Sequence, residues 1–476
     1  MPVGVFIAAL ALYLATLAPT LTVAHFGADG GDFAAAIATH GVPHPPGYPT
    51  YLAIGSLFAQ LPLGTIAFRL NLLSAMCMAL TAAITTWGVS KVASPSTSTL
   101  AGLAFAAAPM VWGQATIAEV HALNALFVAI ILGLLAPIVF RSDTASTSHL
   151  ALACFIWGLG LGNQLTLLAL LPFFISAARS ATRAPYVSRF TRYSILITAF
   201  LTGLSIYMLI PLRAAAQPPI NWLGEVTPQN VINFITADLY RGYAFTVPLS
   251  DLPTRLLAFT QIAVAQFGWA GVLLGAFGAW QMILKKQRGL SAVIPSALLY
   301  LIFTLGYNTP DSDLYLIPVW LFGTWSIAAG AHNLLGRAPA VLRRPSFVAV
   351  LILIPGLGVI TNYAALDLHA DRTSETFAQQ VWGQSPRDSI VITHTDAQTF
   401  TLWYYRLVEQ QRPDVTVIDA RLVAYEWSAP MLRAQDAKLN LVAYDPEAAW
   451  LDRLRAANPA RPVCEIAVIT SQVKCP

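Results

Sequence analysis

The sequence predicts an α-helical membrane protein with about eleven transmembrane helices and a small α/β domain after them. The first observation behind this fold class is composition: 56% of the 476 residues are hydrophobic, only 11% are charged, and mean hydropathy is +0.62. Soluble globular domains carry roughly a quarter charged residues. The second observation is that apolar runs recur as far as residue 365, after which charged and amphipathic segments take over.

The apolar runs set the predicted spans, because a helix needs about 20 apolar residues to cross the hydrocarbon core. The runs lie near residues 3–24, 66–90, 99–113, 120–140, 150–162, 164–178, 193–212, 258–284, 290–307, 314–331 and 346–365. Asn163 and Gln164 interrupt the apolar stretch 150–178. That stretch therefore predicts either a hairpin of two half-length helices or one longer span.

The distribution of charge predicts the orientation of the chain. Alternate loops hold cations and, apart from Asp143, no obvious acid: Lys91, Arg141, Arg179, Arg183, Arg189, Arg192, Lys285, Lys286, Arg288, Arg337, Arg343 and Arg344. The opposite loops hold the acids Asp29, Asp32, Glu119, Glu225, Asp238, Asp251, Asp311 and Asp313. The positive-inside rule then places the N-terminus on the cytoplasmic side, and the acidic loops and the C-terminal domain on the outer side. We expect the membrane to be a bacterial-type cytoplasmic membrane.

Two domains follow from these patterns. We expect a transmembrane module over residues 1–365, with outer loops at 25–65, 113–120 and 213–257, and an extracytoplasmic α/β domain over 366–476. In the second domain, residues 388–393, the end of 412–419 and 466–470 have the pattern of strands, and 398–411 that of a helix. Strand–helix–strand order predicts a parallel pair. Cys464 and Cys475 are close enough in sequence for a disulfide if this domain is outside the cell.

The first outer loop has the densest polar chemistry of the chain. It begins with Asp29-Gly-Gly-Asp32-Phe, and acids at a membrane face are costly unless they are paired, bound or used. Because they are three residues apart, the two acids would share one face of a helical turn. One of them could act as a general base on an attacking hydroxyl. The alternative for either is capping of a short helix that starts here.

The same loop continues as His44-Pro-Pro-Gly-Tyr48-Pro. Proline fixes its own φ and restricts the residue before it, so we expect His44 and Tyr48 to be extended and rigidly presented. A rigid histidine beside two acids suits binding of a phosphate or sugar. The alternative is a proline-rich turn without a function in binding.

Further candidates for substrate or phosphate binding lie at the outer ends of other spans. Glu119 and His121 could position a substrate, contribute to a metal site that lacks an assignable third ligand, or end a helix. Polar groups within spans usually face the protein interior, and outer arginines can bind phosphate or extend to lipid headgroups. These further candidates are Arg69, Asn71, Asn163, Gln164 and Arg241. No metal site is assigned, so a divalent cation is an open alternative rather than an expected cofactor.

Several function classes have little support. The sequence has no basic stripe with interleaved aromatic residues, so we expect no nucleic-acid partner. The C-terminal segment has neither a glycine-rich phosphate loop nor a nucleophile elbow.

Asp396 and Asp419 directly follow predicted strands, where they would contact a ligand, cap a helix or form a turn.

These stretches together resemble a known family. The motifs are Ala28-Asp-Gly-Gly-Asp-Phe, Gly41-Val-Pro-His-Pro-Pro-Gly-Tyr-Pro, Ala118-Glu-Val-His and, in the tail, Arg412-Pro-Asp-Val-Thr. They are similar to a family of multi-pass membrane proteins of formerly unknown function, related to the protein O-mannosyltransferases and grouped with the GT-C glycosyltransferases. The family usually has Glu at the position of Asp32 and His at that of Gln164, which favours Asp29 as the catalytic acid and leaves the role of Gln164 in doubt.

The resemblance implies a GT-C fold and an activity. Such enzymes take a sugar, here expected to be mannose-like, from a polyprenyl-phosphate donor and pass it to a protein, glycan or lipid acceptor outside the membrane. By this resemblance Asp29 is the base, Asp32 is the second candidate, and the anomeric carbon is inverted. The alternatives are a transporter, which predicts acids deep within spans or paired broken helices, and a non-catalytic sensor or assembly factor whose outer domain binds a partner.

Overall fold

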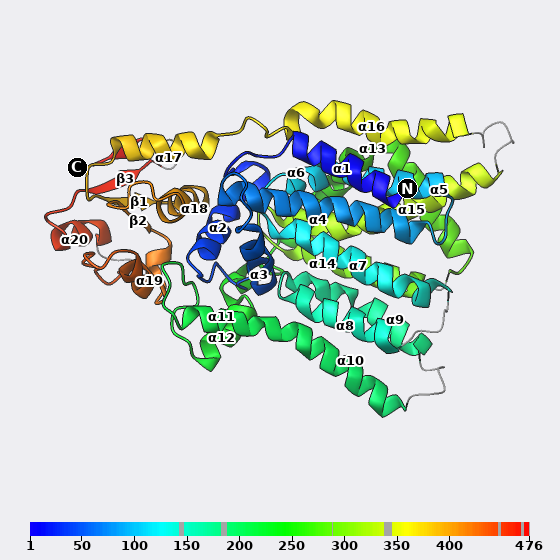
Figure 1. The fold of residues 1–476 in the computed structure, drawn as a ribbon, viewed down its shortest axis with the longest axis horizontal. Helices are drawn as coiled ribbons and strands as arrows, with labels where there is room; N and C mark the ends of the chain where they lie inside the picture. The colour runs from blue at the N-terminus through cyan, green and yellow to red at the C-terminus, as the bar shows by residue number, and fades with distance from the viewer. Residues whose placement is uncertain are drawn as a thin grey trace.

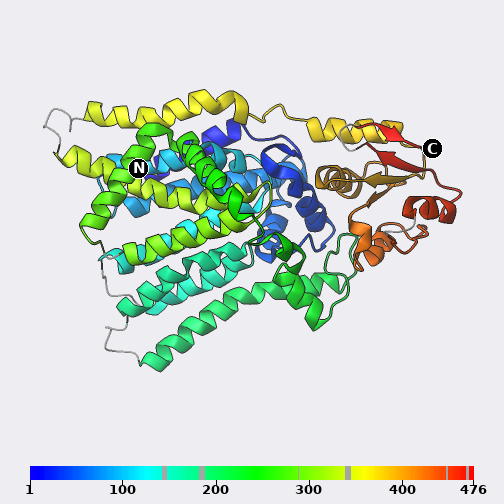
Figure 2. The same cartoon turned by 180° about the vertical axis from the view of Figure 1, so that it is seen from behind.

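The computed structural model describes residues 1–141, 147–181, 188–287, 289–337, 345–445, 449–467 and 471–475. A bundle of long helices forms one end of the molecule and a small sheet with its helices forms the other (Figure 1). The same division is seen from behind (Figure 2). Arg183, Arg288, Arg343, Arg344 and Asp143, on which the predicted orientation partly depends, lie outside the described residues.

The bundle confirms an α-helical membrane protein. Within the described ranges, five helical stretches are long and apolar enough to cross a bilayer: Ile66–Val89, Val120–Phe140, Phe190–Ala214, Leu249–Leu284 and Ser312–Arg337. Its helices are α1 (Pro2–Ala15), α4 (Ile66–Val89), α5 (Pro95–Ala106), α6 (Pro109–Ala115), α7 (Val120–Arg141), α8 (Thr147–Leu161), α9 (Leu171–Ala181), α10 (Arg189–Leu204), α13 (Leu252–Leu284), α14 (Leu290–Gly306), α15 (Ile317–Arg337) and α16 (Pro345–Leu366). Helix α4 packs against α1, α5 and α7.

Two predicted spans differ from the structure, and a third follows one of its two predicted forms. The first ends at Ala15 rather than at residue 24, because the Thr16 hydroxyl donates to the Leu12 carbonyl and Pro19 cannot continue the helix. The span expected at 99–113 is divided into α5 and α6 by Pro109, whose preceding residue is extended. The stretch 150–178 forms a hairpin, with α8 followed by a 3-10 turn and α9.

Glycines allow helices of the bundle to pack closely against each other. A side chain at Gly158 of α8 would lie 2.2 Å from the Phe200 carbonyl oxygen of α10, and one at Gly330 of α15 would lie 2.1 Å from the Leu274 carbonyl oxygen of α13. In lipid there is no hydrophobic driving force between helices, so their association depends on van der Waals packing. Small residues strengthen this packing because they let two helix backbones approach closely.

Short helices form a layer between the bundle and the sheet (Figure 1). They are α2 (Gly30–Ala38), α3 (Pro49–Phe58), α11 (Leu209–Ala214), α12 (Pro228–Ile235) and the 3-10 turn at Asp238–Tyr243. The predicted outer loops at 25–65 and 213–257 therefore meet at one end of the bundle.

The C-terminal segment forms a four-stranded sheet. Its elements are α17 (Thr373–Gln384), β1 (Ile390–Thr393), α18 (Asp396–Trp403), β2 (Thr416–Asp419), α19 (Ser428–Gln435), α20 (Trp450–Ala457), β3 (Val463–Ile466) and β4 (Val473–Lys474). The order is β2-β1-β3-β4, with β1 parallel to β2 and β3, and β4 antiparallel to β3. The parallel pair is confirmed. The third strand begins three residues earlier than predicted, and residues 468–470 lie outside the described ranges.

The two faces of this sheet pack into different cores, as alternating side chains on strands allow. Ile390, Ile392 and Ile418 pack with helices α19 and α20 in a core of the C-terminal domain alone. Val391 and Val417 belong to the cluster that continues into the helical bundle through α18. The second face therefore fixes the C-terminal domain against the layer that holds the first outer loop. Cys464 and Cys475 form a disulfide between β3 and the last described residues.

Candidate active site

The first outer loop starts with a 3-10 helix over Ala24–Asp29 and continues directly into α2. Asp29 occupies the N-cap position of α2, but its side chain makes no capping hydrogen bond. Asp32 lies in the first turn and bonds to other parts of the chain. Capping therefore does not explain either carboxylate.

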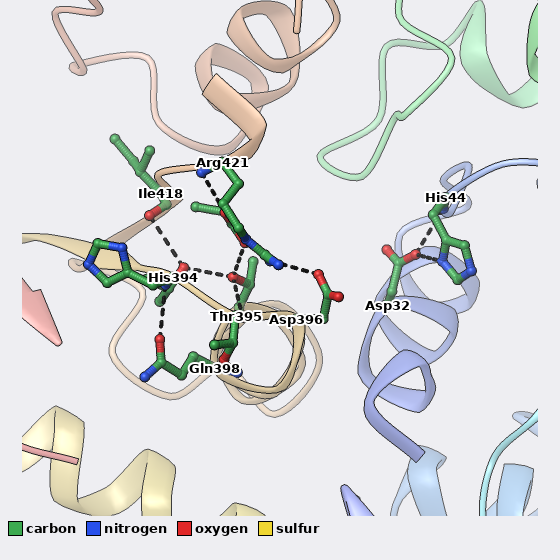
Figure 3. Close-up of polar contacts among 11 residues, drawn as sticks. Asp32, His44, His394, Thr395, Asp396, Gln398, Ile418 and Arg421 are labelled. Carbon is green, nitrogen blue, oxygen red and sulfur yellow. Dashed lines mark hydrogen bonds and ion pairs between the residues drawn. The ribbon is translucent and has the colours of Figure 1, made fainter. Parts of the chain in front are cut away.

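Asp32 lies in the protein interior, where its side chain has no exposed surface and is fixed by hydrogen bonds. One of its oxygens accepts from the backbone N–H of His44 (2.9 Å) and lies 2.8 Å from the Nδ1 of the same residue (Figure 3). The other accepts from the indole Nε1–H of Trp222 (3.2 Å). A buried carboxylate is tolerated only when its oxygens are paired in this way. Asp32 thereby joins the first outer loop to the loop at 213–257.

His44 lies between the two acids. While Nδ1 faces Asp32, Nε2 lies 3.4 Å from the Oδ2 of Asp29. Burial alone would lower the pKa of His44, but the charge of Asp29 and the bond with Asp32 outweigh it and raise the pKa to about 9. The ring is therefore an imidazolium at neutral pH, with both nitrogens able to donate.

Asp29 is the accessible member of this row of three. Its carboxylate keeps 39% of its side-chain surface exposed, whereas the side chains of Asp32 and His44 keep 0% and 5%. Surrounding protein raises the pKa of Asp29 to about 6, and the charge of His44 limits the rise. At neutral pH Asp29 is therefore mostly ionised. Because its pKa lies close to neutral pH, the carboxylate can both take up a proton and release it again.

Tyr48 closes the loop in a conformation that the sequence did not indicate. We expected extended geometry before Pro49, but Tyr48 has φ 44° and ψ 50°, in the left-handed region, and follows Gly47 at φ 85°. The prediction was wrong because tertiary packing decides here: the ring lies edge-on against Phe33 (5.2 Å) and His44 (5.1 Å). The Pro45–Pro46 peptide bond is cis.

Glu119 lies in a second, buried polar cluster near Asp29. It is 4% exposed, its Oε2 accepts from the Val120 N–H (3.3 Å), and its Oε1 has no hydrogen-bond partner among the described residues. Burial raises its pKa well above the usual range, and the charges of Asp29 and Asp311 add to the rise. A protonated Glu119 would be a donor to a bound hydroxyl or phosphate oxygen.

Three other predicted residues belong to the same buried cluster. His121 Nδ1 lies 3.5 Å from Gln164 Nε2, and the His121 ring lies edge-on to Tyr315. Asn163 Nδ2 donates to the Val120 carbonyl. The side-chain oxygens of Asn163 and Gln164 have no partner in the described part of the chain. The structure therefore brings together residues that are far apart in the sequence.

Three predicted residues have other partners. The guanidinium of Arg69 donates to the carbonyls of Ala59, Leu63 and Gly64, which fixes the loop before α4. Asn71 donates to the carbonyls of Ala18 and Thr20, just beyond the end of α1. Arg241, with 72% of its side chain exposed, pairs with Asp238. Each of the three Arg69 nitrogens already donates to a carbonyl, and both amide hydrogens of Asn71 are used, so we do not assign substrate contacts to these residues.

The structure adds site residues that the sequence patterns did not single out. The Phe400 ring stacks parallel to His44 at a centroid distance of 6.4 Å, and Trp222 bonds Asp32. Asp311 acts electrostatically on Asp29 and Glu119, and Tyr240 acts on Tyr48. The signal in the sequence was only that these residues are acids and aromatics in outer segments. Asp396, which was a candidate from its place after a predicted strand, acts on Asp29 as well. Among the described residues, no three His, Cys, Asp or Glu side chains are grouped so that they could hold a metal ion.

Two family models match parts of this chain. Residues 29–184 match the family model "Protein O-mannosyl-transferase TMEM260 N-terminal domain", and residues 374–443 match "TMEM260-associated domain 2". The first match contains Asp29, His44 and Glu119, and the second contains Asp396 and Phe400. The chain is thus similar to the TMEM260 proteins in both of these parts. It is 25% identical to mouse protein O-mannosyl-transferase TMEM260 over 468 residues, and 23% identical to the Dictyostelium discoideum protein over 485.

This chain spans less than two thirds of the length of the two TMEM260 proteins. The alignments cover 90% and 89% of this chain, but only 64% of the mouse protein and 57% of the Dictyostelium protein. Among solved structures, ArnT from Cupriavidus metallidurans bound to undecaprenyl phosphate superposes with a TM-score of 0.59 at 12% identity, covering 99% of this chain and 97% of ArnT. Apo ArnT gives 0.50 at 13% identity, with 98% and 86% covered. The predicted resemblance and the GT-C fold are thus confirmed.

Proposed function

We propose that this chain is a membrane glycosyltransferase that moves a sugar from a polyprenyl-phosphate donor to a hydroxyl group of an acceptor outside the membrane, with Asp29 as general base. The observation that supports this most is the row Asp32–His44–Asp29, in which two buried groups hold one exposed carboxylate. The names of the TMEM260 relatives and the lipid phosphate in ArnT support the sugar and the donor class.

The reaction is a single displacement. Asp29 takes the proton of the acceptor hydroxyl, and the oxygen attacks the anomeric carbon of the sugar. The bond from that carbon to the phosphate oxygen breaks, polyprenyl phosphate leaves with the electron pair, and the configuration is inverted. No covalent sugar–enzyme intermediate is needed.

The residues around Asp29 suit this step. Both His44 nitrogens face carboxylates, so His44 orients Asp29 and keeps its pKa from rising further. Burial, neighbouring tyrosines and Asp29 hold the pKa values of Tyr48 and Tyr240 well above the usual range, so both phenols keep their protons. Tyr48, Tyr240 and protonated Glu119 are the donors we assign to the charge that develops on the leaving phosphate. Arg241 is a further, exposed candidate for that phosphate.

The proposal includes a location. We place the chain in a bacterial-type cytoplasmic membrane with the N-terminus inside and the C-terminal domain outside. The asymmetry of Lys and Arg supports this orientation, as does the Cys464–Cys475 disulfide, since such bonds persist in oxidising compartments.

The test is sugar transfer by the purified full chain in lipid nanodiscs, with a radiolabelled polyprenyl-phosphate sugar as donor. Asp29→Asn keeps the volume of the side chain and removes its basicity, and we expect transfer to fall by at least about a hundredfold, the usual contribution of a general base. Asp251→Asn, at an exposed acid that accepts a hydrogen bond from the neighbouring Ser250, is the matched control. A loss of less than about tenfold, roughly 1.4 kcal/mol of barrier, would show that Asp29 is not the base.

A further inference from the structure

A pocket lies at the end of the helical bundle that is remote from the catalytic loop. It is lined by the C-terminal parts of α4 and α7 and by α15, and its residues include Trp87, Lys91, Pro137, Phe140 and Trp325. Helices α4 and α7 run from the layer of short helices to the far end of the bundle (Figure 1). The pocket is therefore separate from the candidate active site and takes no part in the proposed reaction.

Small residues make room for the aromatic walls of this pocket. A Cβ at Gly88 would lie 2.9 Å from the Cζ2 of Trp325, and a Cβ at Gly133 would lie 3.2 Å from the Cζ3 of Trp87. The Phe140 ring stacks on Trp325 at a centroid distance of 6.0 Å. Trp87 is 42% exposed, so the pocket is open at the surface of the bundle. Walls of this kind suit an acyl chain that enters from the bilayer.

Lys91 adds a positive charge to the edge of the pocket. Its ammonium nitrogen lies 4.9 Å from the centre of the Trp87 ring, one helical turn earlier in the chain. Helices α4, α5, α7 and α15 contain no Asp or Glu, and neither does the turn at residues 90–94. These elements around Lys91 therefore offer it no carboxylate, and its charge is available to an anion from outside the chain.

Two polar groups of the pocket residues add to this argument. Pro137 has no N–H, so the Gly133 carbonyl does not receive the hydrogen bond that an ordinary residue at position 137 would donate within α7. The indole Nε1–H of Trp325 is buried and has no hydrogen-bond partner among the described residues. Buried polar groups are normally paired. A ligand with a hydroxyl group and phosphate oxygens would supply both a donor and acceptors here.

We propose that this pocket binds one anionic phospholipid of the adjacent leaflet, with its phosphate at Lys91 and an acyl chain between α4, α7 and α15. Basic pockets between transmembrane helices bind anionic headgroups in this way. Charge complementarity selects this occupant, because the ammonium of a zwitterionic lipid would be repelled by Lys91. The polyprenyl donor is not the occupant, since the proposed function places its phosphate beside Asp29 at the other end of the bundle.

A lipid in this pocket would act on the stability of the bundle. It would fill the space between three helices and would bind only the folded chain, which raises the free energy of unfolding by mass action. The other ends of two of these helices adjoin the buried polar cluster near Asp29, since α7 begins directly after Glu119 and α15 begins two residues after Tyr315. The lipid therefore stabilises helices that also position parts of the candidate active site.

The experiment titrates phosphatidylglycerol or phosphatidylcholine into the purified full chain in a neutral detergent, and native mass spectrometry counts the bound lipids. We expect one phosphatidylglycerol to bind more tightly than phosphatidylcholine. Lys91→Gln should weaken phosphatidylglycerol about fivefold, the effect of one Lys near an anionic lipid surface, and leave phosphatidylcholine unchanged. Lys286→Gln is the matched control, because it removes the same charge from an exposed residue that does not line the pocket.

A second variant tests the apolar part of the pocket without a change of charge. Ala136 lines the pocket, so Ala136→Leu should fill it and remove the tight phosphatidylglycerol site. The unfolding temperature of this variant in detergent without added lipid shows whether it is folded. Equal affinity of the wild type for the two lipids would show that charge does not select the occupant, and the proposal would be wrong.

Two further results would also overturn it. If Lys91→Gln and Lys286→Gln weaken phosphatidylglycerol equally, the attraction belongs to all cations at this end of the bundle rather than to the pocket. If inorganic phosphate displaces phosphatidylglycerol, the site binds a free anion and the assigned lipid is wrong.

Discussion

The Nδ1 atom of His44 lies 2.8 Å from the Oδ2 of Asp32, and the same oxygen accepts the backbone N–H of His44. One carboxylate thus fixes both the ring and the main chain of the residue that contacts Asp29. Because Asp32 also bonds Trp222, the position of Asp29 depends on two outer loops that are about 190 residues apart in the chain. The arrangement explains why a buried acid is needed beside an exposed one.

Asp32→Asn should therefore affect stability as well as activity. Removal of the charge leaves the His44 imidazolium with one buried partner fewer, and breaking a buried ion pair costs about 3–5 kcal/mol. We expect a clearly lower unfolding temperature in nanodiscs and a large loss of sugar transfer. Asp452→Asn, at an acid that is 71% exposed, should change stability by less than about 0.5 kcal/mol. An unchanged unfolding temperature for Asp32→Asn would contradict the anchoring role.

The pH dependence of transfer should have two limbs. Asp29 acts as a base only when ionised, so the rate should rise as pH increases through about 6. His44 orients Asp29 as an imidazolium, so the rate should fall as pH increases through about 9. The measurement is kcat against pH between 5 and 10, with acceptor and donor both saturating.

His44→Gln tests the assignment of the two limbs. The upper limb should disappear, because no proton is lost there. The lower limb should move to higher pH, because the His44 charge no longer limits the pKa of Asp29. A lower limb that stays in place would mean that another group controls it.

Gly31→Ala tests the contact between the C-terminal domain and the catalytic loop. A Cβ at residue 31 would meet the Phe400 carbonyl at 2.3 Å, and backbone atoms on two packed helices cannot both move aside without displacing α18. We expect a loss of transfer and a destabilisation of about 1–3 kcal/mol. Gly383→Ala is the matched control, since a Cβ there meets no atom within 4 Å and alanine favours the helix. Equal behaviour of the two variants would show that the domains are not tightly joined.

The sequence predicted the parts of this structure that depend on local patterns. Apolar runs located α4 and α7 nearly to the residue, and strand–helix–strand order indicated the parallel β1–β2 pair. Local signals failed where packing decides. Tyr48 takes a left-handed conformation because its ring fits between Phe33 and His44, and no rule for residues before proline contains that information.

The candidate site shows the same limit. Composition and resemblance indicated Asp29 and Asp32, but only the structure separates an exposed carboxylate from a buried anchor. The place of Arg69 near the outer end of α4 predicts a phosphate ligand, whereas in the structure each of its three nitrogens donates to a carbonyl. Phe400 could not be found from the sequence, because its role follows from the docking of α18 on α2, more than 360 residues away in the chain.

The Cys464–Cys475 disulfide allows a test of membrane orientation. With the C-terminal domain outside, a membrane-impermeant phosphine added to intact cells should reduce this bond, and an impermeant maleimide should then add two labels to the chain. Without the phosphine we expect little labelling, because Cys77 is buried and Cys154 is half-buried within α8. The double variant Cys464→Ser/Cys475→Ser controls for labelling elsewhere. Labels that appear only after the cells are permeabilised would place the domain inside and reverse the proposed orientation.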